Sequence, residues 1–101
     1  MDILNERYIK ESNFVTRSIA EETIIVPINS GVGDLDSIYT LNEVGSTVWK
    51  LIDGERSTSQ IVEAIIEEFE VTREEAIRDV LALLAQLQAE GLIRPQTERE
   101  D

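Results

Sequence analysis

The sequence predicts an α+β fold with a winged-helix-like arrangement, in which a three-stranded antiparallel sheet is followed by three helices. In residues 37–52, SIYTLNEVGSTVWKLI, a two-residue alternation stops at Asn42 and a period of about 3.6 residues begins. Residues that favour strands dominate before Asn42, and helical patterns dominate after it. Two capping boxes in the second half of the chain mark two helix starts.

Length and composition are those of one folded domain. The chain has 101 residues, of which 42% are hydrophobic and 30% charged, enough for a single core. Residues 1–12 carry mixed charge without a sustained period, and the last residues are polar. We therefore expect an N-terminal arm over 1–12, a domain over 13–94 and a flexible tail over 95–101.

Three strands are predicted before Asn42. The β-rich runs Phe14–Ile19 and Thr23–Ile28 flank a short polar turn and predict two antiparallel strands. Pro27 lacks an N–H donor, so it belongs at a strand end or a sheet edge. A run of turn-forming residues then precedes a third strand, from about Asp36 to Leu41. A sheet this small has edges whose unpaired backbone groups can accept another strand.

The first predicted helix runs from about Glu43 to Ile52. Asn42 can cap its first turn, and Gly54 supplies a left-handed position just beyond its end. Trp49 lies on this helix and is expected to pack in the core.

Two further helices are predicted, with only two residues in the turn between them. They should therefore meet at a sharp angle, as in a helix-turn-helix. The last helix has a wide apolar stripe, which either touches both the other helices and the sheet or stays partly open as a groove. After Gly91, Leu92 and Ile93 are expected to fold back onto the core. The capping boxes are Ser57 with Gln60 and Thr72 with Glu75, and the helices run over Thr58–Phe69 and about Arg73–Glu90.

Composition excludes most catalytic and metal sites. The chain contains no histidine and no cysteine, so it lacks the usual nucleophile–base pairs and the common zinc or copper ligands. Adjacent glutamates on the predicted helices point about 100° apart and are expected to be solvated surface rather than paired acids. We therefore predict a protein that is not an enzyme and holds no cofactor or metal.

The charge balance argues strongly against nucleic acid as a partner. Nine basic against 21 acidic residues give a formal net charge of −12, which is the wrong sign for phosphate contacts and for anionic membrane surfaces. The charged N-terminus is no signal peptide, and no run of about 18 apolar residues follows it. We expect the cytoplasm.

Two function classes follow from these patterns. A winged-helix transcriptional regulator would place the last helix in DNA, but that helix is rich in Asp and Glu. A peptide-binding module would add an extended partner to the sheet edge and bury side chains against the last helix. A structural subunit of an enzyme complex is a third reading.

Seven sequence features follow one another between about residues 23 and 93. Together they resemble the PqqD-like family, also called RiPP recognition elements. The features are the strand leading into LNEVG (41–45), Trp49, LIDG (51–54), Ile61 with Ile65, EFEVTREEA (68–76), Asp79-Val80 with Leu84 and Leu87, and Gly91-Leu92-Ile93.

The resemblance implies a non-catalytic adaptor that binds the leader segment of a ribosomally made precursor peptide. Such adaptors present the precursor to a modifying enzyme, often a radical-SAM protein, a cyclodehydratase or a leader protease. The founding member serves pyrroloquinoline quinone biosynthesis, and relatives serve lasso peptides. In the family the leader pairs with the third strand beside the third helix. Carried onto this chain, the peptide-binding residues are Asp36, Ser37, Ile38, Tyr39 and Thr40 on the strand and Asp79, Ala82, Leu83 and Gln86 on the helix.

The sequence leaves the precursor, the product and the modifying enzyme open. It also leaves open which face of the third strand meets the leader, because Tyr39 faces opposite to Ile38 and Thr40 on an alternating strand. A free edge further permits a strand-paired homodimer that would compete with the leader for the same backbone groups.

Overall fold

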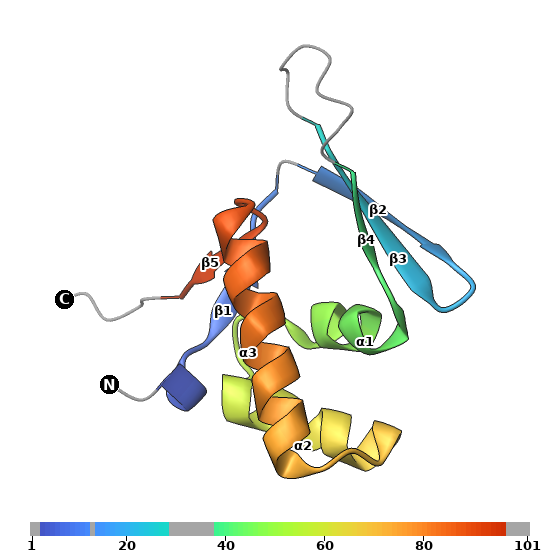
Figure 1. The fold of residues 1–101 in the computed structure, drawn as a ribbon. Helices are drawn as coiled ribbons and strands as arrows, with labels where there is room; N and C mark the ends of the chain where they lie inside the picture. The colour runs from blue at the N-terminus through green and yellow to red at the C-terminus, as the bar shows by residue number, and fades with distance from the viewer. Residues whose placement is uncertain (1–2, 13, 29–37, 97–101) are drawn as a thin grey trace, which may run out of the picture.

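Two antiparallel sheets and three helices form the fold (Figure 1). The structure is a computed structural model and describes residues 3–12, 14–28 and 38–96. The predicted α+β class, with a three-stranded antiparallel sheet before three helices, is confirmed. The sheet has the order β2-β3-β4, with β2 at Phe14–Ile19, β3 at Glu22–Pro27 and β4 at Tyr39–Leu41, and the helices are α1 (Glu43–Leu51), α2 (Thr58–Phe69) and α3 (Arg73–Ala89).

The larger sheet is a meander. β2 pairs with β3 along its whole length, and Pro27 ends β3, as expected for a residue without an N–H donor. β4 pairs with β3 through three residues, among them Tyr39 opposite Ile25. The predicted third strand is thus observed over Tyr39–Leu41, while Ile38 lies just outside it. Asp36 and Ser37 lie outside the described residues.

The predicted helix starts are all observed. Oδ1 of Asn42 accepts a hydrogen bond of 2.9 Å from the N–H of Gly45, so the cap begins α1 directly after β4. Ser57 and Thr72 each form the predicted capping box. The ends of α1 and α3 lie one residue before their predicted positions. Gly54 has the expected positive φ of +83°, but it is not the C-cap of α1, which is Ile52 in an extended conformation.

A second sheet joins the two ends of the chain. β1 (Tyr8–Lys10) pairs antiparallel with β5 (Ile93–Pro95), and a 3₁₀ helix, η1 (Ile3–Asn5), precedes it. Neither strand was predicted from the sequence: β1 lies in the expected arm, and β5 reaches Pro95 of the expected tail. Strands of three residues carry too little alternation to be recognised, and they depend on tertiary pairing.

The N-terminal segment also bonds to the loop before α2. The carbonyl of Tyr8 accepts from the N–H of Gly54 at 2.9 Å, and the carbonyl of Glu6 accepts from the N–H and the hydroxyl of Thr58 at 2.9 and 3.0 Å. Tyr8 is only 7% exposed. A Cβ added to Gly54 would lie 2.8 Å from Cγ2 of Ile9, so this close approach needs glycine. The segment is therefore an integral part of the fold.

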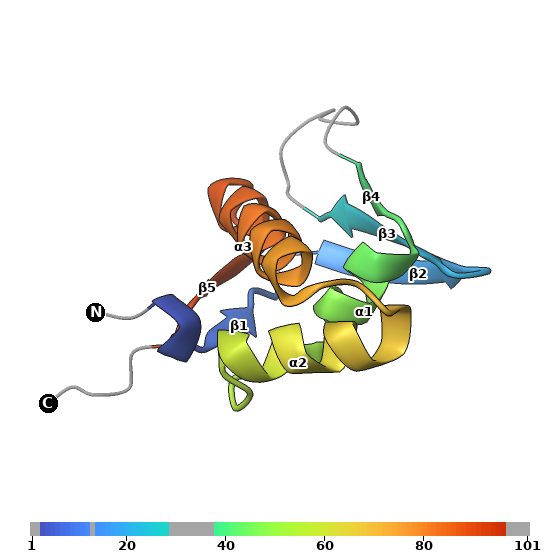
Figure 2. The ribbon, with the colours of Figure 1, turned by 60° about the horizontal axis from the view of Figure 1, so that its bottom comes forward.

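Helix α3 lies between the two sheets (Figure 2). It packs against α2, α1 and β5, and its fully buried residues are Ala76, Val80, Leu84 and Leu87. Leu83 stays partly exposed on the flank that faces β4. The wide stripe thus both contacts several neighbours and leaves one side open. As predicted, Leu92 and Ile93 are buried.

Trp49 joins α1 to both sheets. It is 4% exposed, which confirms its predicted place in the core. The ring of Phe14 in β2 meets it edge-on with centroids 5.4 Å apart, and Nζ of Lys10 in β1 lies 4.7 Å from its ring centroid. In the part of the chain that the structure describes, no helix has the length and apolar character needed to cross a membrane.

The Asn42 cap can be tested by its contribution to stability. We expect Asn42→Ala to lower the free energy of unfolding by about 1 kcal/mol, because the N–H of Gly45 loses its acceptor. Urea titration measures this change. Asn42→Asp keeps an acceptor oxygen, so its free energy of unfolding should stay close to that of the wild type. Equal stability of the wild type, Asn42→Ala and Asn42→Asp would contradict the cap.

The raised pKa of Tyr8 predicts that the folded protein loses stability at alkaline pH. Burial, and secondly the charge of Glu6, raises the pKa of Tyr8 above its usual 10.0. The stability that this shift contributes is present below the unfolded pKa and is lost as pH rises through the folded pKa. Between about pH 9 and about pH 11, Tyr8→Phe should therefore lose less stability than the wild type. Tyr39, whose pKa is also raised, remains in both proteins, so its effect cancels. Parallel losses in urea titrations would refute the prediction.

Candidate functional site

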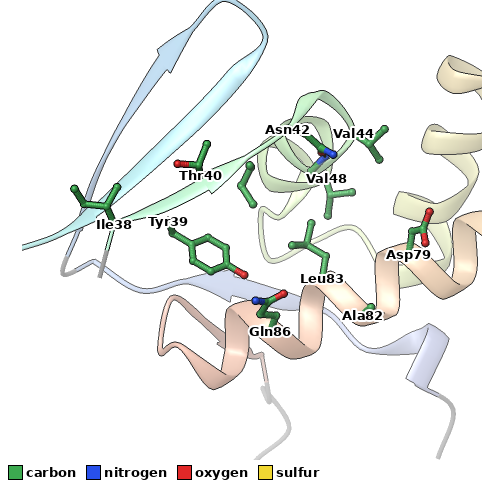
Figure 3. Close-up of a pocket in the computed structure, with 12 residues that line it drawn as sticks. Ile38, Tyr39, Thr40, Asn42, Val44, Val48, Asp79, Ala82, Leu83 and Gln86 are labelled. Carbon is green, nitrogen blue, oxygen red and sulfur yellow. The ribbon is translucent and has the colours of Figure 1, made fainter. Parts of the chain in front are cut away.

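A groove of about 710 Å³ lies between β4 and α3 (Figure 3). Because β4 pairs only with β3 within the described sheet, its other edge is open. The short β4–α1 connection brings the start of α1 into the same groove. The lining residues are Ile38, Tyr39, Thr40, Leu41, Asn42, Val44, Gly45 and Val48, followed by Asp79, Ala82, Leu83 and Gln86 of α3.

The structure brings seven of the nine residues expected from the sequence to this groove. Asp36 and Ser37 are the other two, and both lie outside the described residues. The seven are Ile38, Tyr39, Thr40, Asp79, Ala82, Leu83 and Gln86. Their function as a binding site remains a proposal.

The contribution of α1 was not predicted. Val44 and Val48 lie four residues apart on α1, which is the spacing of a core-facing helix side, and Val48 is 1% exposed. Helical spacing alone cannot distinguish a residue that packs in the core from one that also forms the wall of a groove. The remaining unpredicted members are Leu41, Asn42 and Gly45, at the strand-to-helix junction.

Tyr39 and Ile38 have different surroundings. The Tyr39 ring points toward α3 with its hydroxyl near Gln86 (Figure 3), and the side chain is partly buried. Burial, and secondly the charge of Glu90, raises the pKa of Tyr39. Ile38 is 50% exposed. Of the two, Tyr39 is the residue that packs toward α3.

The groove combines apolar side chains with polar ones, among them Thr40, Asn42 and Gln86. Val44, Val48 and Leu83 form its apolar centre, and among the described residues that line it Asp79 alone carries a full charge. Among the residues that the structure describes, no group of three potential metal ligands occurs. An open strand edge beside apolar side chains is what β-strand addition of an extended peptide requires.

Two solved structures share this fold. TbiB1 in complex with the TbiA(beta) leader peptide has 25% sequence identity and a TM-score of 0.71, with 92% of this chain and 99% of that chain covered. Lasso peptide synthetase B1, complexed with the leader peptide, has 19% identity and a TM-score of 0.72, with 88% and 99% covered. No curated protein matches the chain.

A family comparison assigns most of the chain. The profile of the family described as "Coenzyme PQQ synthesis protein D (PqqD)" matches residues 22–93. The match begins with β3 and extends through all three helices into β5, so it includes every lining element of the groove. The chain is therefore a member of the PqqD family.

Proposed function

We propose that this protein is a non-catalytic adaptor that binds the leader segment of a ribosomally made precursor peptide and delivers it to a modifying enzyme. The observation that carries the proposal is the open edge of β4 beside the groove. TbiB1, with 25% sequence identity, is described in complex with a leader peptide, and this supports the same class of ligand here.

Strand addition explains how such a site binds without catalytic groups. An extended leader would extend the sheet as a fourth strand and satisfy the open backbone groups of β4. Because side chains alternate along a strand, every second leader side chain would point into the groove. There it would meet the apolar surface of Val44, Val48 and Leu83. Backbone pairing supplies affinity, and the groove supplies selectivity.

The bound length is expected to exceed β4 itself. In this proposal Asp36 and Ser37 continue the pairing edge before Ile38, as expected from the sequence. The modifying enzyme would be a radical-SAM protein, a cyclodehydratase or a leader protease, acting in the cytoplasm where the precursor is made. A homodimer paired through β4 would block the same edge, so leader binding and such a dimer would exclude each other.

Backbone pairing predicts a periodic response to N-methylation of the leader. The probe is the leader of a candidate precursor peptide, to be sought among short reading frames beside the gene of this protein. Each N-methyl group removes one donor, and only alternate residues of an added strand direct their N–H toward β4. Calorimetric titration of singly N-methylated leaders should therefore give strong and weak losses of affinity at alternate positions.

Amide shifts locate the same interaction. Titration of the unmodified leader into ¹⁵N-labelled protein should perturb residues 38–41 and α3. Shifts confined to α2 or to residues 3–12, or N-methyl effects without a two-residue period, would contradict strand addition. Binding of a modifying enzyme without binding of the free leader would instead favour a structural subunit.

Filling the groove should weaken leader binding. Ala82 lies in the groove and Ala85 does not, although both are exposed residues of α3. We expect Ala82→Phe to weaken leader binding at least about tenfold, equal to about 1.4 kcal/mol, because the ring occupies space that leader side chains need. Ala85→Phe is the matched control and should bind like the wild type. Equal affinities of the two variants in calorimetry would argue against the groove.

A further inference from the structure

We infer that the groove selects leaders that place a lysine or arginine against Asp79, next to an apolar side chain held by Val44, Val48 and Leu83. This inference rests on the proposed function and specifies the chemistry of the leaders that the site accepts. It is carried by the position of Asp79 in the groove, by the weakness of its ion pair with Arg78 and by the acidic character of the chain.

Asp79 marks one end of the groove. In Figure 3 it lies on the side of Val44, whereas Gln86 lies near Tyr39 at the other end. The charge of Glu90, one turn beyond Gln86, acts on Tyr39, which agrees with this order along α3. The apolar residues Val44, Val48 and Leu83 lie between the two ends (Figure 3). A bound strand would thus meet apolar surface in the middle of the groove and a carboxylate at one end.

The carboxylate of Asp79 is available to a ligand. Its recorded ion pair is with the adjacent Arg78, where Nε lies 3.6 Å from Oδ1. This separation is longer than a hydrogen bond, and the two side chains are 71% and 62% exposed, so the pair is weak. A leader cation that also contacts the groove wall would be less solvated and would pair with Asp79 more strongly.

Further carboxylates lie near the start of α1, the helix whose first turn borders the groove. Glu43 begins α1 between the lining residues Asn42 and Val44, and the charge of Glu21, with a further contribution from Glu68, raises the pKa of Glu43. The positive end of the α1 dipole lies here too, but Oδ1 of Asn42 already accepts from the N–H of Gly45. Glu43 in the first turn offsets the dipole further. The formal net charge of −12 adds long-range attraction for a basic peptide.

The topology also gives an order for the two leader residues. β4 runs from Tyr39 toward Leu41 and then into α1, that is, toward the end of the groove that holds Asp79. A leader that continues the antiparallel order of β2, β3 and β4 runs the opposite way. It would enter at Asp79 and leave near Gln86. The basic residue would therefore precede the apolar one in the leader sequence.

Selection from a peptide library tests this inference without knowledge of the natural leader. The full chain would be immobilised and panned against displayed random peptides of about 12 residues, long enough to span an average strand. We expect wild-type binders to be enriched in Lys or Arg before an aliphatic or aromatic residue. Asp79→Lys should replace that preference with Asp or Glu at the same position, and Asp79→Asn should abolish it. Glu67→Lys is the matched control, because it makes the same charge change on an exposed residue of α2 outside the groove.

Affinities of one selected peptide then provide a double-mutant cycle. Exchange of its basic residue for Glu should weaken binding to the wild type about tenfold, and Asp79→Lys should restore most of that loss. Thermal melts verify that each variant is folded. The inference is overturned if Asp79→Lys leaves the charge preference unchanged, or if Glu67→Lys changes it equally. In either case, alternating N-methyl effects would still support leader binding. If the wild type bound neither a library peptide nor the leader used as the probe above, the proposed function would be overturned as well.

Discussion

The fold depends on the junction at Asn42, where a strand becomes a helix within one residue. Leu41 is 4% exposed and holds the end of β4 in the core, while Asn42 caps α1 immediately afterwards. The hydroxyl of Ser46 also donates to the carbonyl of Leu41 at 3.3 Å. These contacts fix the direction of β4 relative to α1, and thereby leave its open edge facing α3. A longer connection would allow the strand to move and the groove to close.

The second sheet supports the opposite side of α3. β1 and β5 come from the two ends of the described chain. The N–H of Gly54 donates to the carbonyl of Tyr8 in β1, and the N–H of Thr58, the first residue of α2, donates to the carbonyl of Glu6 just before β1. Lys10 and Phe14 then reach the same tryptophan, so one buried ring connects the two sheets. The packing that orients α3 thus involves both ends of the chain. The position of α3, which forms one wall of the groove, therefore depends on residues far from it in sequence.

One acidic residue, Asp79, has surroundings that differ from those of most other carboxylates in the chain. Most carboxylates are solvated surface, and two of them form exposed ion pairs in Asp53–Arg56 and Glu63–Arg73, which contribute little to stability. Asp79 differs because it lines the groove, where the other lining residues that the structure describes are uncharged. The same residue type thus serves solubility over most of the surface and, in our proposal, ligand selection at one position. Selection by Asp79 is compatible with the PqqD family assignment. Strand addition relies on backbone hydrogen bonds and needs no charged side chain besides Asp79.

The sequence by itself determined the helices, the main sheet and the class of the fold. Capping residues such as Asn42 and Thr72 act through neighbours three positions away, and the richness of β2 and β3 in β-forming residues is likewise local. Both signals can therefore be recognised without coordinates. Family resemblance placed seven lining residues of the groove. Only the tertiary structure revealed the pairing of β1 with β5 and the contribution of Val44 and Val48 to the groove. Those features arise from contacts between segments distant in the chain, and a three-residue strand or a single helical face carries no local signal of its partner.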